Sequence, residues 1–245
     1  MKMTPSETLT ALYYYHLYSF AERSFYELNP GAEFHYGHHI RAICYKLEQV
    51  FLGNIKRLLI LMPPRHLKSH CATVAFPAWA MGRDPTKRIV SISYGANLAE
   101  TFSRQSRHLM QTEWYGAVFP DLEIDPSRAS VEEVLTTKAG LRMSTSIGGA
   151  LTGKGGDILI IDDPMKAEDV SSEKKREANW DWFNSTALTR LNSPKDGAII
   201  VVAQRLHADD LPGRLIATGD WEVLELPAIE TRDREIALNS ITTLH

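Results

Sequence analysis

A lysine and a serine, Lys68-Ser69, follow the apolar stretch Arg57 to Met62 and the short segment Pro63-Pro-Arg-His-Leu67. The residues after Ser69 can form a helix as far as Met81. Proteins hold a nucleoside triphosphate with backbone N–H groups, a lysine near the β- and γ-phosphates, a helix N-terminus and a hydroxyl on Mg²⁺. Lys68 and Ser69 fit the lysine and hydroxyl roles, so this segment is a candidate phosphate-binding loop.

The loop departs from the usual pattern G-x-x-x-x-G-K-[ST], because Met62 and Leu67 occupy the glycine positions. Forcing a leucine into left-handed backbone costs roughly 1–2 kcal/mol. Either the loop follows a different path or nucleotide binding is impaired, and an ordinary loop after a strand stays an alternative. If a nucleotide binds, the residues predicted to contact it are Pro64, Arg65, His66, Leu67, Lys68 and Ser69.

A pair of carboxylates ends a second apolar run, Asp157-Ile-Leu-Ile-Ile-Asp-Asp-Pro164. In P-loop ATPases, one carboxylate at such a strand end orders Mg²⁺ and the next acidic group polarises the attacking water. Asp162, with Ser69, is therefore the predicted metal ligand, and Asp163 is the predicted catalytic acid. An acidic pair in a turn is the alternative, but the two motifs together favour ATP and Mg²⁺.

Short apolar and β-branched runs predict the strands that position these groups. They are Arg57 to Met62, Arg88 to Tyr94, Leu141 to Ile147, Asp157 to Ile161, Ala198 to Ala203 and Trp221 to Leu226. A helix is predicted over Val170 to Leu191, and alternation of the two element types predicts an α/β fold with a mainly parallel central sheet flanked by helices. We expect an N-terminal helical segment over 1–54, an ATPase domain over 55–230 and a tail or linker over 231–245.

Composition sets broad limits on the function. The chain has 245 residues, of which 44% are hydrophobic and 23% charged, with a net charge of −3, so disorder and a strongly basic DNA-binding domain are not indicated. Its two cysteines, Cys44 and Cys71, lack the spacing of a zinc site. The apolar runs are shorter than the roughly 18 residues that suggest a membrane span, so we expect a cytoplasmic protein without a membrane partner.

Four further motifs occur in the chain besides the lysine-serine loop and the acidic strand end. They are Leu151-Thr-Gly-Lys-Gly-Gly-Asp157, Asp181-Trp-Phe183, Thr189-Arg-Leu191 and Gln204-Arg-Leu-His-Ala-Asp-Asp-Leu211. With the lysine-serine loop and the acidic strand end, this set resembles the large terminase subunit of tailed bacteriophages and prophages over roughly residues 34–230. The resemblance implies a P-loop NTPase fold of the ASCE type, and such proteins commonly lack the standard loop glycines.

The same resemblance implies a function and partners. It implies an ATP-hydrolysing motor that assembles as a homo-oligomeric ring, a pentamer, on a portal protein, works with a small terminase subunit and drives double-stranded DNA into a procapsid in the bacterial cytoplasm. Whether the isolated chain is a monomer or a ring stays open.

Roles for individual residues follow from the resemblance. Arg65 becomes a proposed trigger near the γ-phosphate, Gln204 with Arg205 a coupling motif, and Lys154 a contact to phosphate or a neighbouring subunit. The alternative for Arg205 is a surface ion-pair network with His207 and Asp210. His38 and His39 lie where terminases contact adenine, but neither is chosen, because adjacent residues point to different helix faces.

Nuclease activity is not expected, because fifteen residues follow Glu230 and they are too few for the RNase H-like domain of a large terminase. Two other functions stay open. One is a degenerate prophage remnant that binds partners or DNA without catalysis, and the other is a helicase-like ATPase acting on nucleic acid outside packaging.

Overall fold

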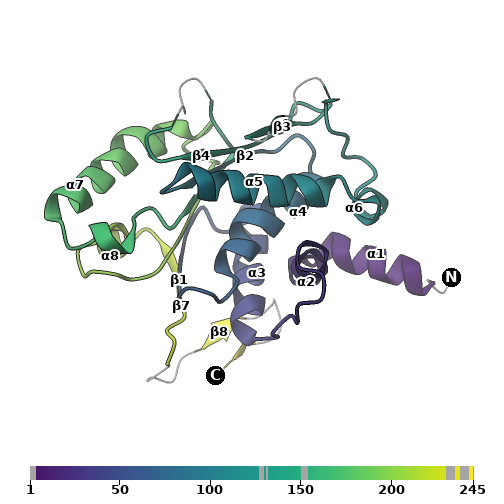
Figure 1. Cartoon of the computed structure of the whole chain (residues 1–245), viewed down its shortest axis with the longest axis horizontal. Helices are drawn as coiled ribbons and strands as arrows, with labels where there is room; N and C mark the ends of the chain where they lie inside the picture. Colours follow the sequence, from purple (N-terminus) through teal and green to yellow (C-terminus); the bar gives the residue numbers. More distant parts are fainter. Residues whose placement is uncertain are drawn as a thin grey trace.

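The computed structural model describes residues 4–126, 130, 132–149, 154–229, 235–237 and 243–244. Within these residues a seven-stranded sheet lies at the centre, in the order β3-β4-β2-β5-β6-β1-β7 (Figure 1). The strands are β1 (Arg57–Leu61), β2 (Arg88–Ser93), β3 (Glu133–Leu135), β4 (Leu141–Ser146), β5 (Ile158–Asp162), β6 (Ala198–Ala203) and β7 (Glu222–Glu225). The six predicted strands all form, within a residue or two of their expected ends.

All pairings in this sheet are parallel except the one between β3 and β4. The antiparallel strand β3 is not predicted by the sequence analysis, because its three residues are too few to show a pattern. The parallel register aligns Leu61 of β1 with Ala203 of β6 and with Glu225 of β7. The carboxyl ends of these strands therefore meet at one edge of the sheet, the edge on which the predicted site motifs lie.

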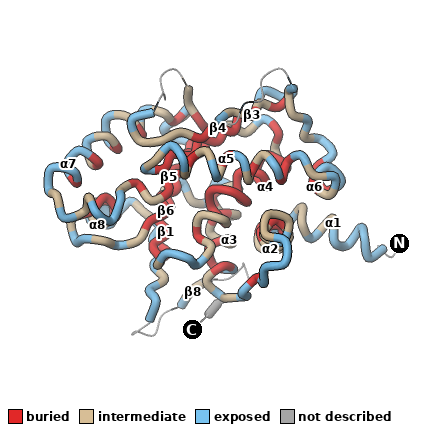
Figure 2. The backbone as a smooth tube through the Cα atoms, viewed as in Figure 1, coloured by how far each residue is buried: buried red, intermediate tan, exposed pale blue. Residues whose placement is uncertain are grey.

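Helices cover both faces of the sheet, so its central strands are buried along almost their whole length (Figure 2). Leu58 and Ile60 of β1 point into one core, shared with α3 (His38–Phe51), η1 (His70–Ala75) and α4 (Phe76–Arg83). Leu59 and Leu61 point into the other, which receives side chains from η4 (Phe183–Ala187) and α8 (Leu211–Thr218). Burial on both faces explains the near-continuous apolar sequence of the strands.

The N-terminal segment is helical, as predicted, with α1 (Pro5–Tyr15) and α2 (Leu17–Leu28) preceding α3. Its aromatic side chains pack: Phe20 contacts Tyr115 and Phe119 of the α6 region (α6 is Glu113–Val118) at centroid distances of 6.1 and 5.7 Å. Helix α2 also reaches the residue after the lysine-serine pair, because Nε2 of His70 lies 2.9 Å from the carbonyl of Ala21.

The single helix predicted over Val170 to Leu191 is partly wrong. A 3-10 turn, η3 (Ala167–Asp169), comes first, and α7 (Glu173–Trp182) then passes into the π-helix η4 and the 3-10 turn η5 (Leu188–Arg190). The remaining long helix, α5 (Ala96–Met110), covers the β2–β4 side of the sheet. No helix in the described part of the chain is long and apolar enough to cross a membrane.

Candidate nucleotide-binding site

The loop between β1 and η1 has left-handed backbone at Leu67, one of the two positions where the motif calls for glycine, and at Arg65, but not at Met62, the other glycine position. Leu67 has φ 61° and Arg65 has φ 65°. Leu67 therefore takes the conformation that glycine usually supplies, at a cost of roughly 1–2 kcal/mol. Its side chain packs against the core formed with α3, η1 and α4, and this burial offsets the strain. The loop therefore does not follow a path that avoids left-handed backbone at Leu67.

Lys68 is buried, with only 4% of its surface exposed, and its ammonium group faces β5. Nζ of Lys68 lies 2.8 Å from Oδ1 of Asp163, the residue directly after β5. Asp163 itself has φ 45°, and its N–H donates to the carbonyl of Val202 on β6. The sheet thus fixes Asp163 in a strained position, as is common at functional sites, where it faces Lys68.

Asp162 is the last residue of β5 and is fully buried. Its carboxylate accepts hydrogen bonds from two hydroxyls, Ser69 Oγ at 3.1 Å and Thr73 Oγ1 at 2.7 Å. Burial, and then the adjacent charge of Asp163, raise the pKa of Asp162 to about 6. A cation bound beside this carboxylate would stabilise its charged form.

The donors around Asp162 fit Mg²⁺ better than a metal that needs many protein ligands. No group of three or more histidine, cysteine, aspartate or glutamate side chains able to hold a metal occurs among the described residues. Mg²⁺ is usually held by one or two carboxylates together with substrate phosphates and water. Asp162 and the hydroxyl of Ser69 provide such a set next to Lys68.

Thr73 belongs to the site although the sequence analysis does not select it. It lies in the π-helix η1, and its carbonyl accepts a hydrogen bond of 3.3 Å from Arg142 of β4. The guanidinium of Arg142 is fully buried and also donates to Ser103 Oγ and Ser144 Oγ, at 3.0 and 2.9 Å. Burial lowers the pKa of Arg142 to about 9. The sequence signal for this arginine is that it is the one charged residue in the predicted buried strand that forms β4, Leu141–Ser146.

Gln204 and Arg205 follow β6 directly, but they lie in different surroundings. Gln204 lines a small cavity together with Asp163, so the structure brings these two predicted residues together. Arg205 instead pairs with Asp210 at 3.4 Å. Asp210 caps α8, accepting from the N–H of Gly213 at 2.8 Å, and also accepts from the N–H groups of Leu206 and His207. The ion-pair alternative for Arg205 is therefore present in the structure, with His207 taking part through its backbone.

The other candidates have separate positions. Arg65 and His66 are exposed on the loop, as is Pro64. The ring of His66 lies 5.8 Å from that of His39 at the start of α3, whereas the structure gives His38 no such contact with the loop. Lys154 forms an ion pair with Glu133 of β3. Residues 150–153 of the glycine-rich stretch lie outside the described part of the chain.

The comparisons with known proteins concern the fold. No protein-family model matches the chain, and no curated protein matches its sequence. Among solved structures, the crystal structure of the large terminase of bacteriophage HK97 matches with a TM-score of 0.53 and 14% identity. That match covers 94% of this chain and 46% of the terminase, so the chain spans less than half of the length of that protein.

The large terminase ATPase domain of Thermus phage P74-26 also matches, with a TM-score of 0.48 and 17% identity over 73% of this chain and 67% of that domain. The resemblance to large terminases is thus confirmed at the level of the fold, by the HK97 match. The predicted fold class, an α/β fold with a mostly parallel central sheet flanked by helices, is confirmed by the same match.

Proposed function

We propose that the chain is the ATP-hydrolysing motor domain of a viral DNA-packaging terminase. One observation carries the proposal: Lys68, Ser69, Asp162 and Asp163 meet at the carboxyl edge of the sheet, joined by contacts of 2.8 and 3.1 Å. This arrangement combines a buried cation, a hydroxyl and two carboxylates beside a loop with left-handed backbone. It has the parts needed to bind a Mg²⁺-triphosphate and activate water.

The residues would act as follows. Lys68 leaves Asp163 and binds the β- and γ-phosphates, while Ser69 and Asp162 hold Mg²⁺, which neutralises phosphate charge when bound. Asp163, released from Lys68, orients the attacking water and accepts its proton at a carboxylate oxygen. Gln204 shares a cavity with Asp163, so it is placed to respond to the state of the γ-phosphate. Arg65 is exposed on the loop and acts as the trigger near the same phosphate.

The biological role rests on the resemblance to large terminases and on the fold shared with the HK97 protein. On that basis the chain binds double-stranded DNA, a portal protein and a small terminase subunit, and it assembles as a ring, a pentamer, in the bacterial cytoplasm. Arg205, held near the end of β6 by Asp210, relays the nucleotide state to DNA-gripping loops.

The test is Mg²⁺-dependent phosphate release from ATP, measured with and without double-stranded DNA. Lys68→Ala and Asp163→Ala are compared with matched changes at exposed positions, Lys138→Ala and Asp121→Ala. Turnover that is lost in the first two variants and kept in the controls supports the ATPase and its site. Turnover that survives Lys68→Ala contradicts the proposal, and no turnover even with DNA at high protein concentration supports the non-catalytic remnant.

A second measurement separates packaging from other DNA-dependent ATPases. The wild-type chain is mixed with portal rings, and binding is followed by sedimentation in the presence of ATP. Binding to the portal supports the terminase role. Strand separation without portal binding would favour the helicase-like alternative.

A further inference from the structure

The buried arginine of β4, Arg142, joins helix α5 to the π-helix η1. Its Nη1 donates to Ser103 Oγ on α5 at 3.0 Å and to Ser144 Oγ on β4 at 2.9 Å. Its Nη2 donates to two carbonyls, that of Phe102 on α5 and that of Thr73 on η1, each at 3.3 Å. One guanidinium group therefore fixes the positions of α5, β4 and η1 relative to each other.

This buried cation has only neutral partners in the described part of the chain. Each hydrogen bond of Arg142 goes to a hydroxyl or to a carbonyl oxygen, and none goes to a carboxylate. Burying a charge without a counter-charge is costly, and replacing buried charged groups by apolar side chains of similar volume is often neutral or stabilising. Packing alone therefore does not explain the arginine, whereas its directed donors provide contacts that an apolar side chain cannot make.

Thr73 connects these contacts to the predicted metal ligand. Its carbonyl accepts from Arg142, and its hydroxyl donates to Oδ2 of Asp162 at 2.7 Å. Thr73 lies in a π-helix, where the N–H of Phe76 donates to the carbonyl of Cys71, and such turns occur frequently at functional sites. Because a β-branched side chain has little freedom about χ1, the direction of the threonine hydroxyl follows its backbone. A shift of Arg142 would therefore change how Thr73 holds Asp162.

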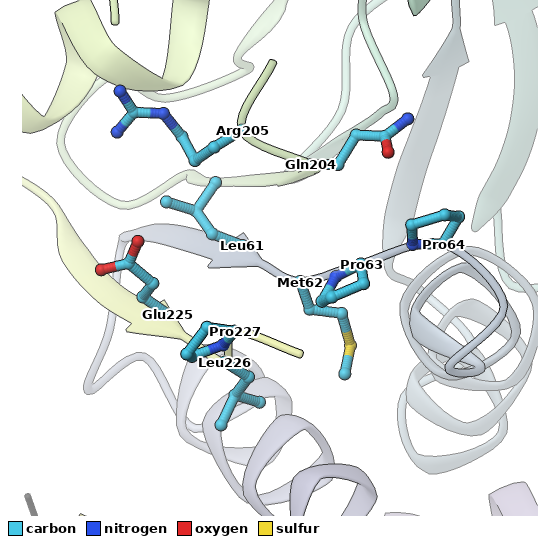
Figure 3. A pocket seen from close by; sticks show the side chains of 9 residues that line it. All are labelled: Leu61, Met62, Pro63, Pro64, Gln204, Arg205, Glu225, Leu226 and Pro227. Atoms are coloured by element: carbon cyan, nitrogen blue, oxygen red, sulfur yellow. The ribbon is translucent and has the colours of Figure 1, made fainter. Parts of the chain in front are cut away.

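The contacts reach Asp162 from the β4 side of the sheet. In the strand order, β4 and β2 lie on one side of β5, whereas β6, β1 and β7 lie on the other. Figure 3 shows the cavity on that other side, which is lined by the first residues of the phosphate-binding loop and by the ends of β6 and β7, and not by Arg142, Thr73 or Ser103. A change at Arg142 can therefore affect the metal ligand without altering the residues that line this cavity.

We infer that Arg142 is a positioning residue for the Mg²⁺ site: through Thr73 it sets the affinity of Asp162 for the metal and couples this affinity to the position of α5. The inference rests on the proposed function and adds a means of regulation to the same site. Coupling between two sites is reciprocal, so metal binding at Asp162 also holds α5 in place. A displacement of α5, whose outer residues Thr101 and Arg104 are exposed, would change the Mg²⁺ requirement of the site.

Buried serines test these contacts with little change in packing, because serine and alanine differ by one oxygen atom. Ser103→Ala and Ser144→Ala each remove one acceptor of Arg142. Ser106→Ala is the control on α5, and Ser91→Ala is the control in the sheet, where Ser91 of β2 is aligned with Ser144. Both control serines are buried, and their hydroxyls have no hydrogen-bond partner among the residues that the structure describes.

The measurement is the affinity of the full chain for ATP by calorimetry, once with Mg²⁺ and once with EDTA. The ratio of the two affinities gives the contribution of the metal. Groups that orient a metal ligand affect metal affinity about 10–100-fold, and since the effect here passes through Thr73, the ratio should fall about three- to tenfold in Ser103→Ala and Ser144→Ala. Arg142→Lys, which keeps the charge but loses the planar fork of donors, should lower the ratio at least as far. The affinity in EDTA, and the ratio in the two controls, should not change.

Hydrogen exchange tests the coupling to α5. Adding Mg²⁺ to the ATP-bound chain should slow amide exchange in α5 of the wild type, and should slow it less in Ser103→Ala than in Ser106→Ala. Unchanged exchange in α5 of the wild type would show that metal binding does not reach this helix, and would overturn the coupling.

The outcomes separate the inference from the proposed function. Equal Mg²⁺ ratios in Ser103→Ala and Ser106→Ala would overturn the role of Arg142, and so would variants that lose stability in urea while keeping the wild-type ratio, since the arginine would then be purely structural. The ATPase site would stand in both cases if Lys68→Ala still abolished ATP binding. If the wild-type chain binds no ATP, or gains no affinity from Mg²⁺, the proposed function itself fails.

Discussion

The ammonium group of Lys68 and the carboxylate of Asp163 are in contact, 2.8 Å apart. Lys68 is buried, so this ion pair keeps a cation from lying unpaired inside the protein. In the proposed function, Lys68 binds the β- and γ-phosphates and Asp163 orients the attacking water. ATP binding must therefore break the pair, and the carboxylate becomes free for water only when the lysine has moved to the phosphates.

Asp163→Asn separates these two roles. The amide is a poor base, so turnover should fall by about 10²–10⁴-fold, the usual contribution of general base catalysis. ATP affinity should stay the same or rise several-fold, because Lys68 no longer has to break an ion pair with a carboxylate before it binds the phosphates. Single-turnover phosphate release and nucleotide calorimetry measure the two quantities. Turnover close to that of the wild type would remove Asp163 from the mechanism.

Thr73→Val tests the hydroxyl that holds Asp162. The bond from Thr73 Oγ1 to Asp162 is 2.7 Å long and buried. Groups that orient a metal ligand typically affect metal affinity by about 10–100-fold, so the Mg²⁺ concentration for half-maximal turnover should rise within that range. Thr73→Ser keeps the hydroxyl and serves as the control. Equal Mg²⁺ requirements in the valine and serine variants would show that this bond has no part in metal binding.

Ala139→Gly tests the cost of left-handed backbone away from the site. Ala139 is exposed in a turn with φ 65°. Glycine removes strain of roughly 1–2 kcal/mol but gains freedom in the unfolded chain, so the free energy of unfolding should rise by about 0.5–1 kcal/mol. Leu67→Gly, at φ 61°, should bring less benefit, because it also loses packing against the core. Urea denaturation checks both, and a destabilised Ala139→Gly variant would contradict the expectation.

Two helical glycines form a matched pair for the packing around Phe119. A Cβ on Gly82 of α4 would lie 2.5 Å from the ring of Phe119, whereas a Cβ on Gly116 of α6 would meet nothing within 4 Å. Gly82→Ala should therefore destabilise the protein by about 1–3 kcal/mol. Gly116→Ala should stabilise it by up to about 1 kcal/mol, from helix propensity alone. The check is the melting temperature of each variant, measured by thermal unfolding. Similar melting temperatures for Gly82→Ala and Gly116→Ala would show that the Phe119 ring moves aside at little cost.

The sequence predicts the parts of this molecule that have a strong local pattern. Buried parallel strands such as β1 and β6 are continuous apolar runs, and both acidic residues after Ile161 stand out at a strand end. The adjacency of Lys68 to Asp163 follows from strand order, because β6 and β5 succeed β1 in the sheet and all three end at one edge.

Other features depend on tertiary contacts that no local pattern reveals. The link from Arg142 through Thr73 to Asp162 joins β4, η1 and β5, which are brought together only by the fold. The spacing of apolar residues also does not predict the change from α7 to the π-helix η4, because both are right-handed helices that follow each other without a break. Residues 150–153, which carry part of the glycine-rich motif, lie outside the described part of the chain.

The π-helix η1 limits how the length of this segment can change. Its six residues, His70–Ala75, place Thr73 against Asp162 and lead directly into α4, whose Trp79 donates to the carbonyl of Tyr14 in α1. Deleting one residue from η1 would turn α4 by about 100° relative to the loop, since an α-helix has 3.6 residues per turn. The N-terminal helices and the metal ligand could then not both keep their contacts. Related sequences should therefore keep the number of residues between Ser69 and Phe76, with no insertion or deletion there.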